Sequence, residues 1–314
     1  MLTRTANSTE FDVPLPPALV VYGGSVRGRL SGPPDAPVIV ALGGISADRF
    51  VCDRDDGRPG WWAGLVGAGR VVDPARWRVL GLDFAADPTG RLAPSTHEQA
   101  EVIVAALDAI GVEQAEAIVG ASYGGMVALA LAELHPERVR KLVVVSAPPA
   151  PHPAASAVRE IQRRMVALGL AAGMGDEALS IARGLAMLTY RTPEEFGERF
   201  AGGIAEPDSL ATCDAGHYLR ARGDAYPAVM SPERFLSLSA SIDRHQVDPV
   251  RVPHPVLVIG ADSDQLVPAG QLRAFATSLP DARLHLIDSL YGHDMFLKEA
   301  ERIGMLIAPF LARP

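Results

Sequence analysis

The chain has 314 residues, of which 48% are hydrophobic and 21% are charged. This length suits one large domain or a core domain with an insertion, and the composition excludes a disordered, collagen-like or disulfide-rich protein. The 29 basic and 37 acidic residues give a net charge of −8. Because nucleic acids and anionic membranes both attract basic surfaces, we expect neither as a partner.

The N-terminal segment and the cysteines indicate where the protein resides. The first 17 residues contain no apolar run of the signal-peptide kind, and no segment approaches the ~18 apolar residues of a spanning helix. Cys52 and Cys213 are the only two cysteines and lie far apart, which fits a reducing compartment. The sequence therefore predicts a soluble cytoplasmic protein. It has no P-loop, no GxGxxG at the first strand–helix turn and no clustered ligand set, so we expect no metal and no nucleotide or redox cofactor.

Short apolar runs are predicted to form a mostly parallel sheet. Several are nearly continuous in Val, Ile and Leu, as strands covered on both faces should be. They are 37–43 (PVIVALG), 77–83 (WRVLGLD), 115–121 (AEAIVGA), 140–146 (RKLVVVS), 255–260 (PVLVIG) and 283–288 (RLHLID). Ahead of them, 19–22 and 26–30 flank Gly23 and Gly24 and predict an antiparallel edge hairpin.

Helix signals fall between these runs. Thr96 is expected to cap a helix that extends to about Ile110 and ends at Gly111. A second helix is expected to begin beside Ser122 and to stop at Pro136, and a third to run from near Asp294 to the C-terminus. Strands alternating with helices in this way predict an α/β fold.

The strand signal disappears between residues 148 and 250. This stretch opens with a proline-rich segment and continues with the helical patterns 155–170 (ASAVREIQRRMVALGL) and 176–190 (DEALSIARGLAMLTY). An all-helical block inserted into an α/β chain predicts a lid over the active face. We therefore divide the chain into a first core part (1–147), a helical lid (148–250) and a second core part (251–314).

Residues 120–124 (GASYG) form a GxSxG pattern that follows a predicted buried strand and opens a helix. This is the setting of a nucleophile elbow, in which the serine stands on a sharp turn above a helix N-terminus. Ser122 is thus the candidate nucleophile, and the chain is predicted to have the α/β-hydrolase fold. The alternative is an ordinary glycine-rich turn between a strand and a helix.

A serine nucleophile needs a base and an acid, which follow it in that fold in the order Ser, acid, His. The strand 255–260 is followed by Asp262 and Asp264. The D-x-x-V-P spacing favours Asp264, and Asp262 remains an alternative with turn capping as its other role. His293 lies in a Gly-His loop after the next strand and before the last helix, which suits the base.

The oxyanion hole needs two backbone N–H donors. The residue after the nucleophile, Tyr123, normally supplies one. The loop after 37–43 should supply the other, and the residues alone do not decide among Leu42, Gly43 and Gly44.

Further segments resemble the homoserine O-acyltransferases of the α/β-hydrolase superfamily, in one order along most of the chain. They are 60–62 (GWW), 64–83 (GLVGAGRVVDPARWRVLGLD), 120–139 (GASYGGMVALALAELHPERV), 154–164 (AASAVREIQRR), 188–192 (LTYRT), 218–220 (YLR), 235–248 (FLSLSASIDRHQVD) and 291–297 (YGHDMFL). The resemblance implies that Ser122 is acylated, that Asp264 and His293 complete a triad, and that Leu42 is the second oxyanion donor beside Tyr123.

The resemblance also implies a binding role for Arg191 and Asp294, as holders of the carboxylate and amino groups of an amino acid. A small zwitterion needs a fixed cation and a fixed anion, and Arg matches the forked shape of a carboxylate. The alternatives are a surface charge on the lid for Arg191 and a helix cap for Asp294.

The implied activity is acyl transfer from acetyl-CoA or succinyl-CoA to the side-chain hydroxyl of homoserine, in methionine biosynthesis, by a ping-pong mechanism without a further cofactor. The apolar lid helices, and the resemblance, predict a homodimer through the lid. Alternatives are a carboxylester hydrolase, transfer to serine or a natural-product hydroxyl, and an inactive binding module.

The chain departs from the family at 86–96 (ADPTGRLAPST), at Val40 and Ala41, where a His is common, and at Tyr123, where Met is typical. These departures are expected to border the acyl channel. They leave the donor open between acetyl and succinyl. A succinyl group would need an extra cation, and the lid is rich in arginine, but the sequence places none in the channel.

Overall fold

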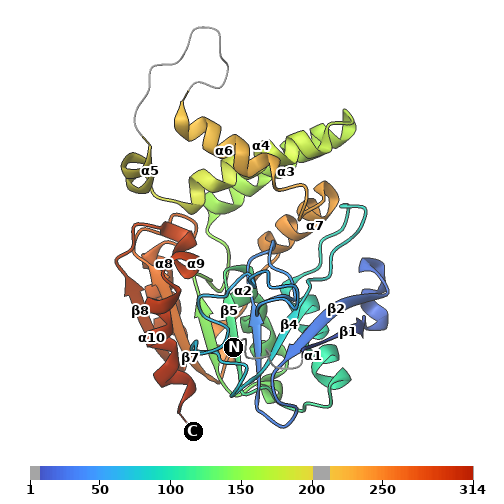
Figure 1. Ribbon diagram of the computed structural model, residues 1–314, viewed down its shortest axis with the longest axis vertical. Helices are drawn as coiled ribbons and strands as arrows, with labels where there is room; N and C mark the ends of the chain where they lie inside the picture. The colour runs from blue at the N-terminus through green and yellow to red at the C-terminus, as the bar shows by residue number, and fades with distance from the viewer. Residues whose placement is uncertain (1–7, 201–212, 314) are drawn as a thin grey trace.

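The computed structural model describes residues 8–200 and 213–313. One sheet in this part runs in the order β1-β2-β4-β3-β5-β6-β7-β8 (Figure 1). Neighbours from β4 to β8 are parallel, whereas β2 pairs antiparallel with both β1 and β4. The strands are β1 (Ser8–Pro14), β2 (Ser25–Ser31), β3 (Val38–Leu42), β4 (Arg78–Leu82), β5 (Ala117–Ala121), β6 (Leu142–Val145), β7 (Pro255–Ala261) and β8 (Asp281–Ile287). The predicted α/β class with a mostly parallel sheet is confirmed.

The predicted hairpin at 19–22 and 26–30 is half wrong. The second run is β2, but the first lies in a 3₁₀ helix, η1 (Pro17–Tyr22), and the antiparallel partner of β2 is β1. Pro17 stands at the start of η1, where its fixed φ suits a helical turn and its missing N–H costs nothing. Most residues of β1 are exposed or half-buried, so this edge strand shows little of the apolar signal on which strand prediction depends.

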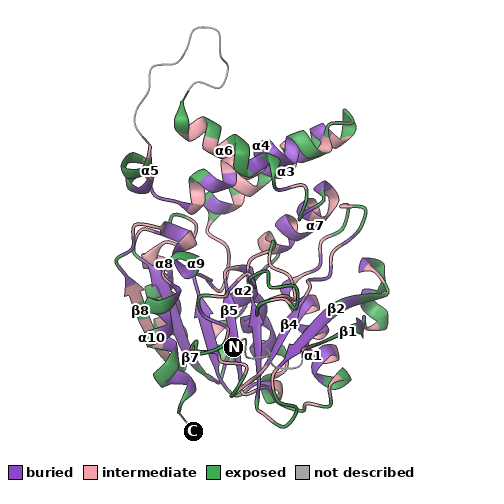
Figure 2. Ribbon diagram, in the orientation of Figure 1, coloured by how far each residue is buried: buried purple, intermediate pink, exposed green. Residues whose placement is uncertain are grey.

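Helices cover both faces of the sheet. Strand residues alternate between two apolar cores, and the strands are largely buried (Figure 2). One core includes α1 (Thr96–Ala109), α2 (Tyr123–Leu134) and α8 (Ala269–Ser278). The other includes α10 (Ala300–Leu311) and the segment 51–72, whose Trp62 donates a hydrogen bond to the Phe296 carbonyl (2.9 Å). Three 3₁₀ turns complete the core: η2 (Pro136–Arg138), η3 (Pro249–Arg251) and η4 (Gly292–Asp294).

Two helix ends differ from their predictions. The cap of α1 is Ser95, not Thr96, because Ser95 and Glu98 exchange hydrogen bonds in a capping box. The predicted C-terminal helix is broken: η4 is followed by α9 (Met295–Lys298), and α10 begins after Glu299, which leaves the helical conformation. The break lets the chain turn past the catalytic edge of the sheet before α10 packs on its face.

Between β6 and β7 the described chain forms only helices and loops, which lie over the C-terminal edge of the sheet (Figure 1). They are α3 (Pro153–Ala171), α4 (Gly175–Tyr190), α5 (Pro193–Arg199), α6 (Asp214–Asp224) and α7 (Pro232–Asp243). We call them the lid helices. Thr96 and His245 tie the lid to the core through a buried hydrogen bond (2.8 Å). None of the helices in residues 8–200 and 213–313 is long and apolar enough to cross a membrane.

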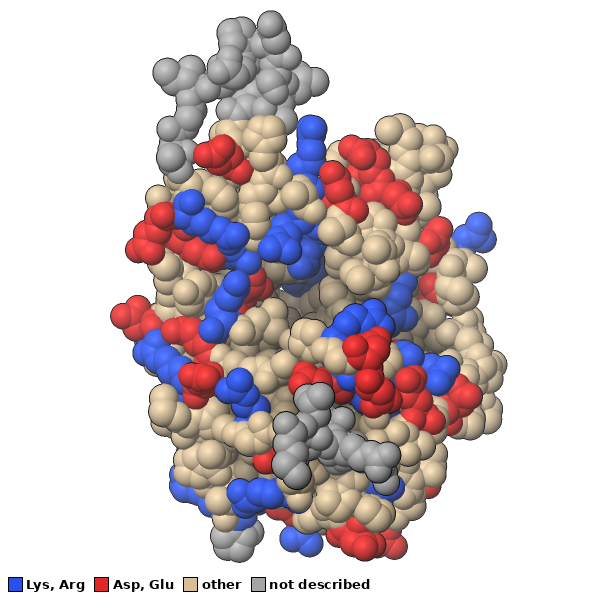
Figure 3. Space-filling view, viewed as in Figure 1, with Lys and Arg blue, Asp and Glu red and all other residues tan. Residues whose placement is uncertain are grey.

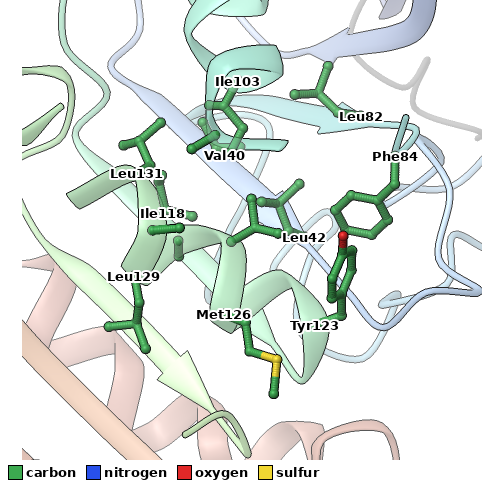
Figure 4. Packing of buried hydrophobic residues seen from close by; sticks show 14 of the residues in the cluster. Val40, Leu42, Leu82, Phe84, Ile103, Ile118, Tyr123, Met126, Leu129 and Leu131 are labelled. Carbon is green, nitrogen blue, oxygen red and sulfur yellow. The ribbon is translucent and has the colours of Figure 1, made fainter. Parts of the chain in front are cut away.

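The turn between β5 and α2 leaves no room for larger residues at its glycines. The Tyr123 ring packs edge-on against Phe84 inside the core (centroids 4.8 Å apart, Figure 4). The first turn of α2 lies against the end of β3, where a Cβ on Gly124 would lie 2.5 Å from the Leu42 carbonyl. Such contacts force backbone to move.

We therefore expect Gly124→Ala to lower the free energy of unfolding by about 1–3 kcal/mol, the usual cost of overpacking, as measured by urea denaturation. Gly270→Ala in α8 is the matched control, because a Cβ there meets nothing within 4 Å. Alanine favours a helix by about 0.5–1 kcal/mol over glycine, so this variant should be at least as stable as the wild type. Equal stability of the two variants would contradict this packing argument.

Candidate active site

Ser122 stands on the turn between β5 and α2 with φ 52° and ψ −123°. Among the described non-glycine residues, only Ser122 and Ser146 have a positive φ. Such conformations cost of order 1–3 kcal/mol and persist where surrounding contacts impose them. Here the Ser122 N–H donates to the Val145 carbonyl (2.8 Å), which fixes the turn to β6. The serine is thus held above the first turn of α2, as the GxSxG pattern predicts.

The structure brings together the three residues that the sequence places far apart. His293, in η4, lies with its Nε2 2.9 Å from the Ser122 hydroxyl and its Nδ1 2.8 Å from Asp264 Oδ2. Asp264 follows β7, and its side chain is fully buried. Asp262, the alternative acid, is half exposed and faces Arg273 at 3.4 Å instead.

The Asp264 side chain is held in position by the backbone as well as by His293. Its Oδ1 accepts hydrogen bonds from the N–H groups of Leu266 (2.9 Å) and Val267 (3.0 Å). Only Oδ2 is left for His293, so the imidazole has one orientation. With a proton on Nδ1 pointing to Asp264, Nε2 presents its lone pair to the serine hydroxyl. This arrangement can remove a proton from Ser122.

Two opposing effects set the protonation of His293. Burial disfavours its charged form, but the negative charge of Asp264 and the hydrogen bond to it outweigh burial, so the pKa of His293 lies above its ordinary 6.5. A base works only when neutral. We expect acylation of Ser122 to be lost as the pH falls through a midpoint above 6.5, measured as kcat/KM against pH. A midpoint below 6.5 would contradict this assignment of the base.

One of the two predicted oxyanion donors is well placed. Tyr123 is the first residue of α2, where backbone N–H groups have no acceptor inside the helix. Leu42 is the last residue of β3, its side chain lies in the core (Figure 4), and it lines neither cavity beside Ser122. Gly44, two residues on, does line a cavity.

Two cavities meet at Ser122 and His293, and both are also lined by Tyr190 and Ile242. The first, which we call the α3 pocket, lies under the lid. Its other lining residues are Met126, Ser146, Pro148, Pro151, His152, Ala155, Val158, Arg159, Gln162, Thr189, Leu266 and Val267. The second, the α4 cavity, is lined also by Gly44, Ile45, Ser46, Ala47, Trp61, Arg183, Asp294, Phe296 and Leu297. The face in Figure 3 is hollowed between lid and core, with basic side chains on both sides.

Arg191 and Asp294 lie together as the resemblance implies, but they are paired with each other. Arg191 Nε lies 3.3 Å from Asp294 Oδ2, and its Nη1 lies 2.9 Å from Glu195 Oε1. Arg191 is buried and lines neither cavity, whereas Asp294 lines the α4 cavity. Asp294 therefore faces the cavity that contains Ser122, and Arg191 lies behind Asp294, away from that cavity.

The sequence did not single out Arg183 or Arg159, which line the cavities. The Arg183 guanidinium lies over the Tyr226 ring (4.7 Å) and near the Tyr190 ring (5.4 Å). Tyr226 is in turn hydrogen-bonded to Ser46 in the loop after β3 (2.7 Å). Arg183 and Tyr190 are seven residues apart on α4, a helical spacing that places both on one face, and this spacing was the available signal.

The departures from the family lie elsewhere than expected. Tyr123 is fully buried and its hydroxyl bonds Ser241 of α7, while Val40 and Ala41 lie in the core. None of these three residues, nor any of 86–96, lines either cavity beside Ser122. These side chains therefore do not line the cavities beside Ser122: Tyr123 joins the core to α7, and Val40 and Ala41 pack in the two cores of the sheet.

Comparison with known proteins identifies the family of this chain. Residues 56–300 match the family model described as alpha/beta hydrolase fold. The chain is 41% identical over 289 residues to the homoserine O-succinyltransferase of Xanthomonas campestris pv. campestris, covering 91% of this chain and 78% of that protein. It is 35% identical to the homoserine O-acetyltransferase of Thermus thermophilus, covering 81% and 73%.

Solved structures support the fold. The homoserine O-acetyltransferase from Bacillus anthracis superimposes with a TM-score of 0.85 over 99% of both chains at 16% identity. Esterase E22 gives a TM-score of 0.84 at 18% identity, over 98% of this chain and all of that one. At these identities the likeness concerns the fold alone, and the sequence relatives identify the group. The chain is an enzyme that belongs to the homoserine O-acyltransferase family of the α/β-hydrolase superfamily.

Proposed function

We propose that this enzyme transfers an acyl group from acyl-CoA to the side-chain hydroxyl of homoserine, as in methionine biosynthesis, through an ester on Ser122. The observation that carries the proposal is the hydrogen-bonded chain from Ser122 through His293 to Asp264, at the junction of two cavities. The names of the curated relatives supply the acceptor. No resident cofactor takes part, and acyl-CoA is a co-substrate.

In the first half-reaction His293 takes the hydroxyl proton of Ser122 as the oxygen attacks the thioester carbonyl. A C–O bond forms, the C–S bond breaks, and the CoA sulfur leaves with the proton from His293. Asp264 keeps the imidazole in its orientation and stabilises its charged form. The products are free CoA and acyl-Ser122.

The tetrahedral oxyanion needs donors on the side of α2. The Tyr123 N–H is one, and the α2 dipole assists it. The second comes from the loop after β3. The Gly43 carbonyl accepts a hydrogen bond from the Gly124 N–H (2.8 Å), which holds this loop beside the first turn of α2. Gly44 lines the α4 cavity, so we prefer its N–H to that of Leu42.

In the second half-reaction the homoserine hydroxyl gives its proton to His293 and attacks the acyl-Ser122 carbonyl. The ester bond to Ser122 breaks, and the serine oxygen recovers the proton from His293. We propose that Asp294 binds the ammonium of homoserine, because its carboxylate lines the α4 cavity. Arg191, ion-paired behind Asp294 and outside both cavities, positions the Asp294 carboxylate for this contact.

Asp294→Asn tests this acceptor site. Without its charge the ammonium loses an ion-paired hydrogen bond, so we expect the KM for homoserine to rise about 10- to 100-fold, the usual range for a hydrogen bond to a charged group. Acylation of Ser122 in the absence of homoserine should keep its rate. Asp281→Asn, at an exposed position of β8, is the control. An unchanged KM in Asp294→Asn would remove Asp294 from the acceptor site.

We also propose that the enzyme is a homodimer through the lid. Two lid helices each expose a pair of large apolar side chains seven residues apart. The pairs are Ile161 and Leu168 on α3, and Ile181 and Leu188 on α4. Residues seven apart share a helix face. Light scattering of the wild type should give twice the chain mass, and Leu168→Glu with Ile181→Glu should give the monomer.

Release of CoA and of free acid, each measured with and without homoserine, tests the transferase itself. We expect one equivalent of CoA per enzyme without the acceptor, and sustained turnover with it. Because the fold is shared with esterases, free acid released at the full rate without homoserine would make the enzyme a hydrolase. Serine in place of homoserine tests the choice of acceptor.

A further inference from the structure

The two cavities beside Ser122 differ in the charged side chains on their walls: the α4 cavity has both Asp294 and Arg183, whereas the α3 pocket has Arg159 alone. The α4 cavity includes the carboxylate of Asp294. The α3 pocket is lined by no Asp or Glu, but it is lined by Arg159 and by polar side chains such as Ser146 and Gln162. An anionic group is therefore better accommodated in the α3 pocket.

Arg159 offers the α3 pocket a positive charge and a free N–H donor. It shares one carboxylate, Asp243, with Arg163: the Arg159 Nη2 and the Arg163 Nη1 each lie 2.6 Å from an Asp243 oxygen. Two guanidinium groups against one carboxylate leave one net positive charge in the cluster. The hydrogen bonds of Arg159 to described residues use its Nε and Nη2, so Nη1 remains free to donate.

Ser146 adds an independent sign of a ligand. It is fully buried, yet its hydroxyl has no hydrogen-bond partner among the described residues. Its φ of 49° is strained for a residue with a side chain. Unpaired buried hydroxyls are rare because each forfeits its hydrogen bond to water. A strained residue with an unpaired hydroxyl on the wall of a pocket is expected to meet a ligand atom there.

The register of the sheet places Ser146 beside the nucleophile. Ala121 of β5 pairs with Val145 of β6, so Ser122 and Ser146 follow their strands at the same edge. Neighbouring strands lie about 5 Å apart. A carboxylate two methylenes beyond the carbonyl of acyl-Ser122 spans a similar length, which matches a succinyl group.

We propose that the α3 pocket binds the distal carboxylate of a succinyl group, with Arg159 as its main ligand and the Ser146 hydroxyl as a second donor. This rests on the proposed acyl transfer and names its donor as succinyl-CoA. The chemistry is that of the first half-reaction: the C–S bond breaks, CoA leaves with the proton from His293, and succinyl-Ser122 forms. Acetyl-CoA has no carboxylate and gains nothing from Arg159.

Arg183 is the rival cation. It lies in the α4 cavity over two tyrosine rings, and no described carboxylate forms an ion pair with it. Asp294 lines the same cavity, and its negative charge would repel the distal carboxylate of a succinyl group placed there. The α3 pocket is the better carboxylate site for this reason.

The test compares acylation of Ser122 by succinyl-CoA and acetyl-CoA, measured by rapid quench and intact-protein mass. We expect the wild type to prefer succinyl-CoA. Arg159→Met should lower kcat/KM for succinyl-CoA about 100-fold, the effect of losing a charge-assisted hydrogen bond, and that for acetyl-CoA by less than about 3-fold. Ser146→Ala should lower the succinyl value about 10-fold, the lower end of the range for a hydrogen bond to a charged group, and should not lower stability, because the deleted hydroxyl has no partner among the described residues.

The controls separate a loss of succinyl binding from a loss of folding and from a general effect of removing a positive charge. In Arg159→Met, Asp243 stays paired with Arg163, and thermal unfolding will report on the lid. Arg164→Met removes an exposed arginine of the same helix and should leave the succinyl-to-acetyl ratio unchanged. Arg183→Met tests the rival.

Three results would overturn the donor assignment: equal losses for both donors in Arg159→Met, a selective succinyl loss in Arg183→Met, or a wild type acylated by acetyl-CoA alone. The last result would leave the proposed acyl transfer intact, provided that homoserine discharges the acetyl-enzyme. Acylation by neither donor would overturn both proposals.

Discussion

Replacing Ser122 with alanine is expected to lower turnover by about 10⁴-fold or more, because the nucleophile of a triad cannot be replaced by its partners. No acyl-enzyme should form, and CoA release should lose its initial burst. The measurement is CoA release with saturating homoserine, together with intact-protein mass after mixing with each acyl-CoA. Normal turnover in this variant would remove Ser122 from the mechanism.

The loss must be separated from a loss of folding. Alanine keeps the Cβ of serine and can occupy the same strained turn, so the thermal midpoint of Ser122→Ala should stay close to that of the wild type. Ser278→Ala is the matched control, because among the described residues the Ser278 hydroxyl bonds only the Phe275 carbonyl, at the end of α8. It should keep full activity.

Replacing Asp264 with asparagine should lower kcat about 10⁴-fold while leaving the fold in place, as when a triad acid is neutralised. Oδ1 of this residue accepts from two backbone N–H groups, so the amide oxygen of asparagine must occupy that position. The amide NH₂ then faces His293 and donates to Nδ1. This forces the imidazole proton onto Nε2, where it blocks acceptance of the Ser122 proton.

The pH profile distinguishes this role from a structural one. Without the Asp264 carboxylate, burial and the charge of Arg159 lower the pKa of His293 and only Asp294 raises it, so the acid limb of the residual activity should move to lower pH than in the wild type. Asp262→Asn is the matched control, since Asp262 faces Arg273 at the surface. A large loss in Asp262→Asn, with little loss in Asp264→Asn, would reverse the assignment of the acid.

The catalytic edge of the sheet could be predicted because each of its parts carries a local signal. Buried parallel strands are continuous apolar runs, and the polar residues that follow them must meet at one edge. This predicts that Ser122, Asp264 and His293 lie close together, whatever the chain between them does. The spacing that favours Asp264 over Asp262 agrees with the hydrogen bond found.

What escaped prediction depends on tertiary contacts. Strand β1 is polar along most of its length, so only its pairing with β2 reveals it. Whether Arg159, Arg183 or Arg191 enters a cavity depends on how the lid packs, and periodicity alone gives each only a helix face. Nothing in the sequence around Ser146 predicts its positive φ, because a serine after a strand is common. Its unpaired hydroxyl can likewise be recognised only in the structure.

One experiment tests the central claim most directly: the enzyme is mixed with acyl-CoA in the absence of acceptor, digested, and searched for the acylated peptide by mass spectrometry. The account predicts a single acyl group on the peptide containing Ser122, which disappears on addition of homoserine as O-acylhomoserine forms in equal amount. Product formation from an enzyme that never carries an acyl group, or an acyl group on another residue that homoserine discharges, would contradict it.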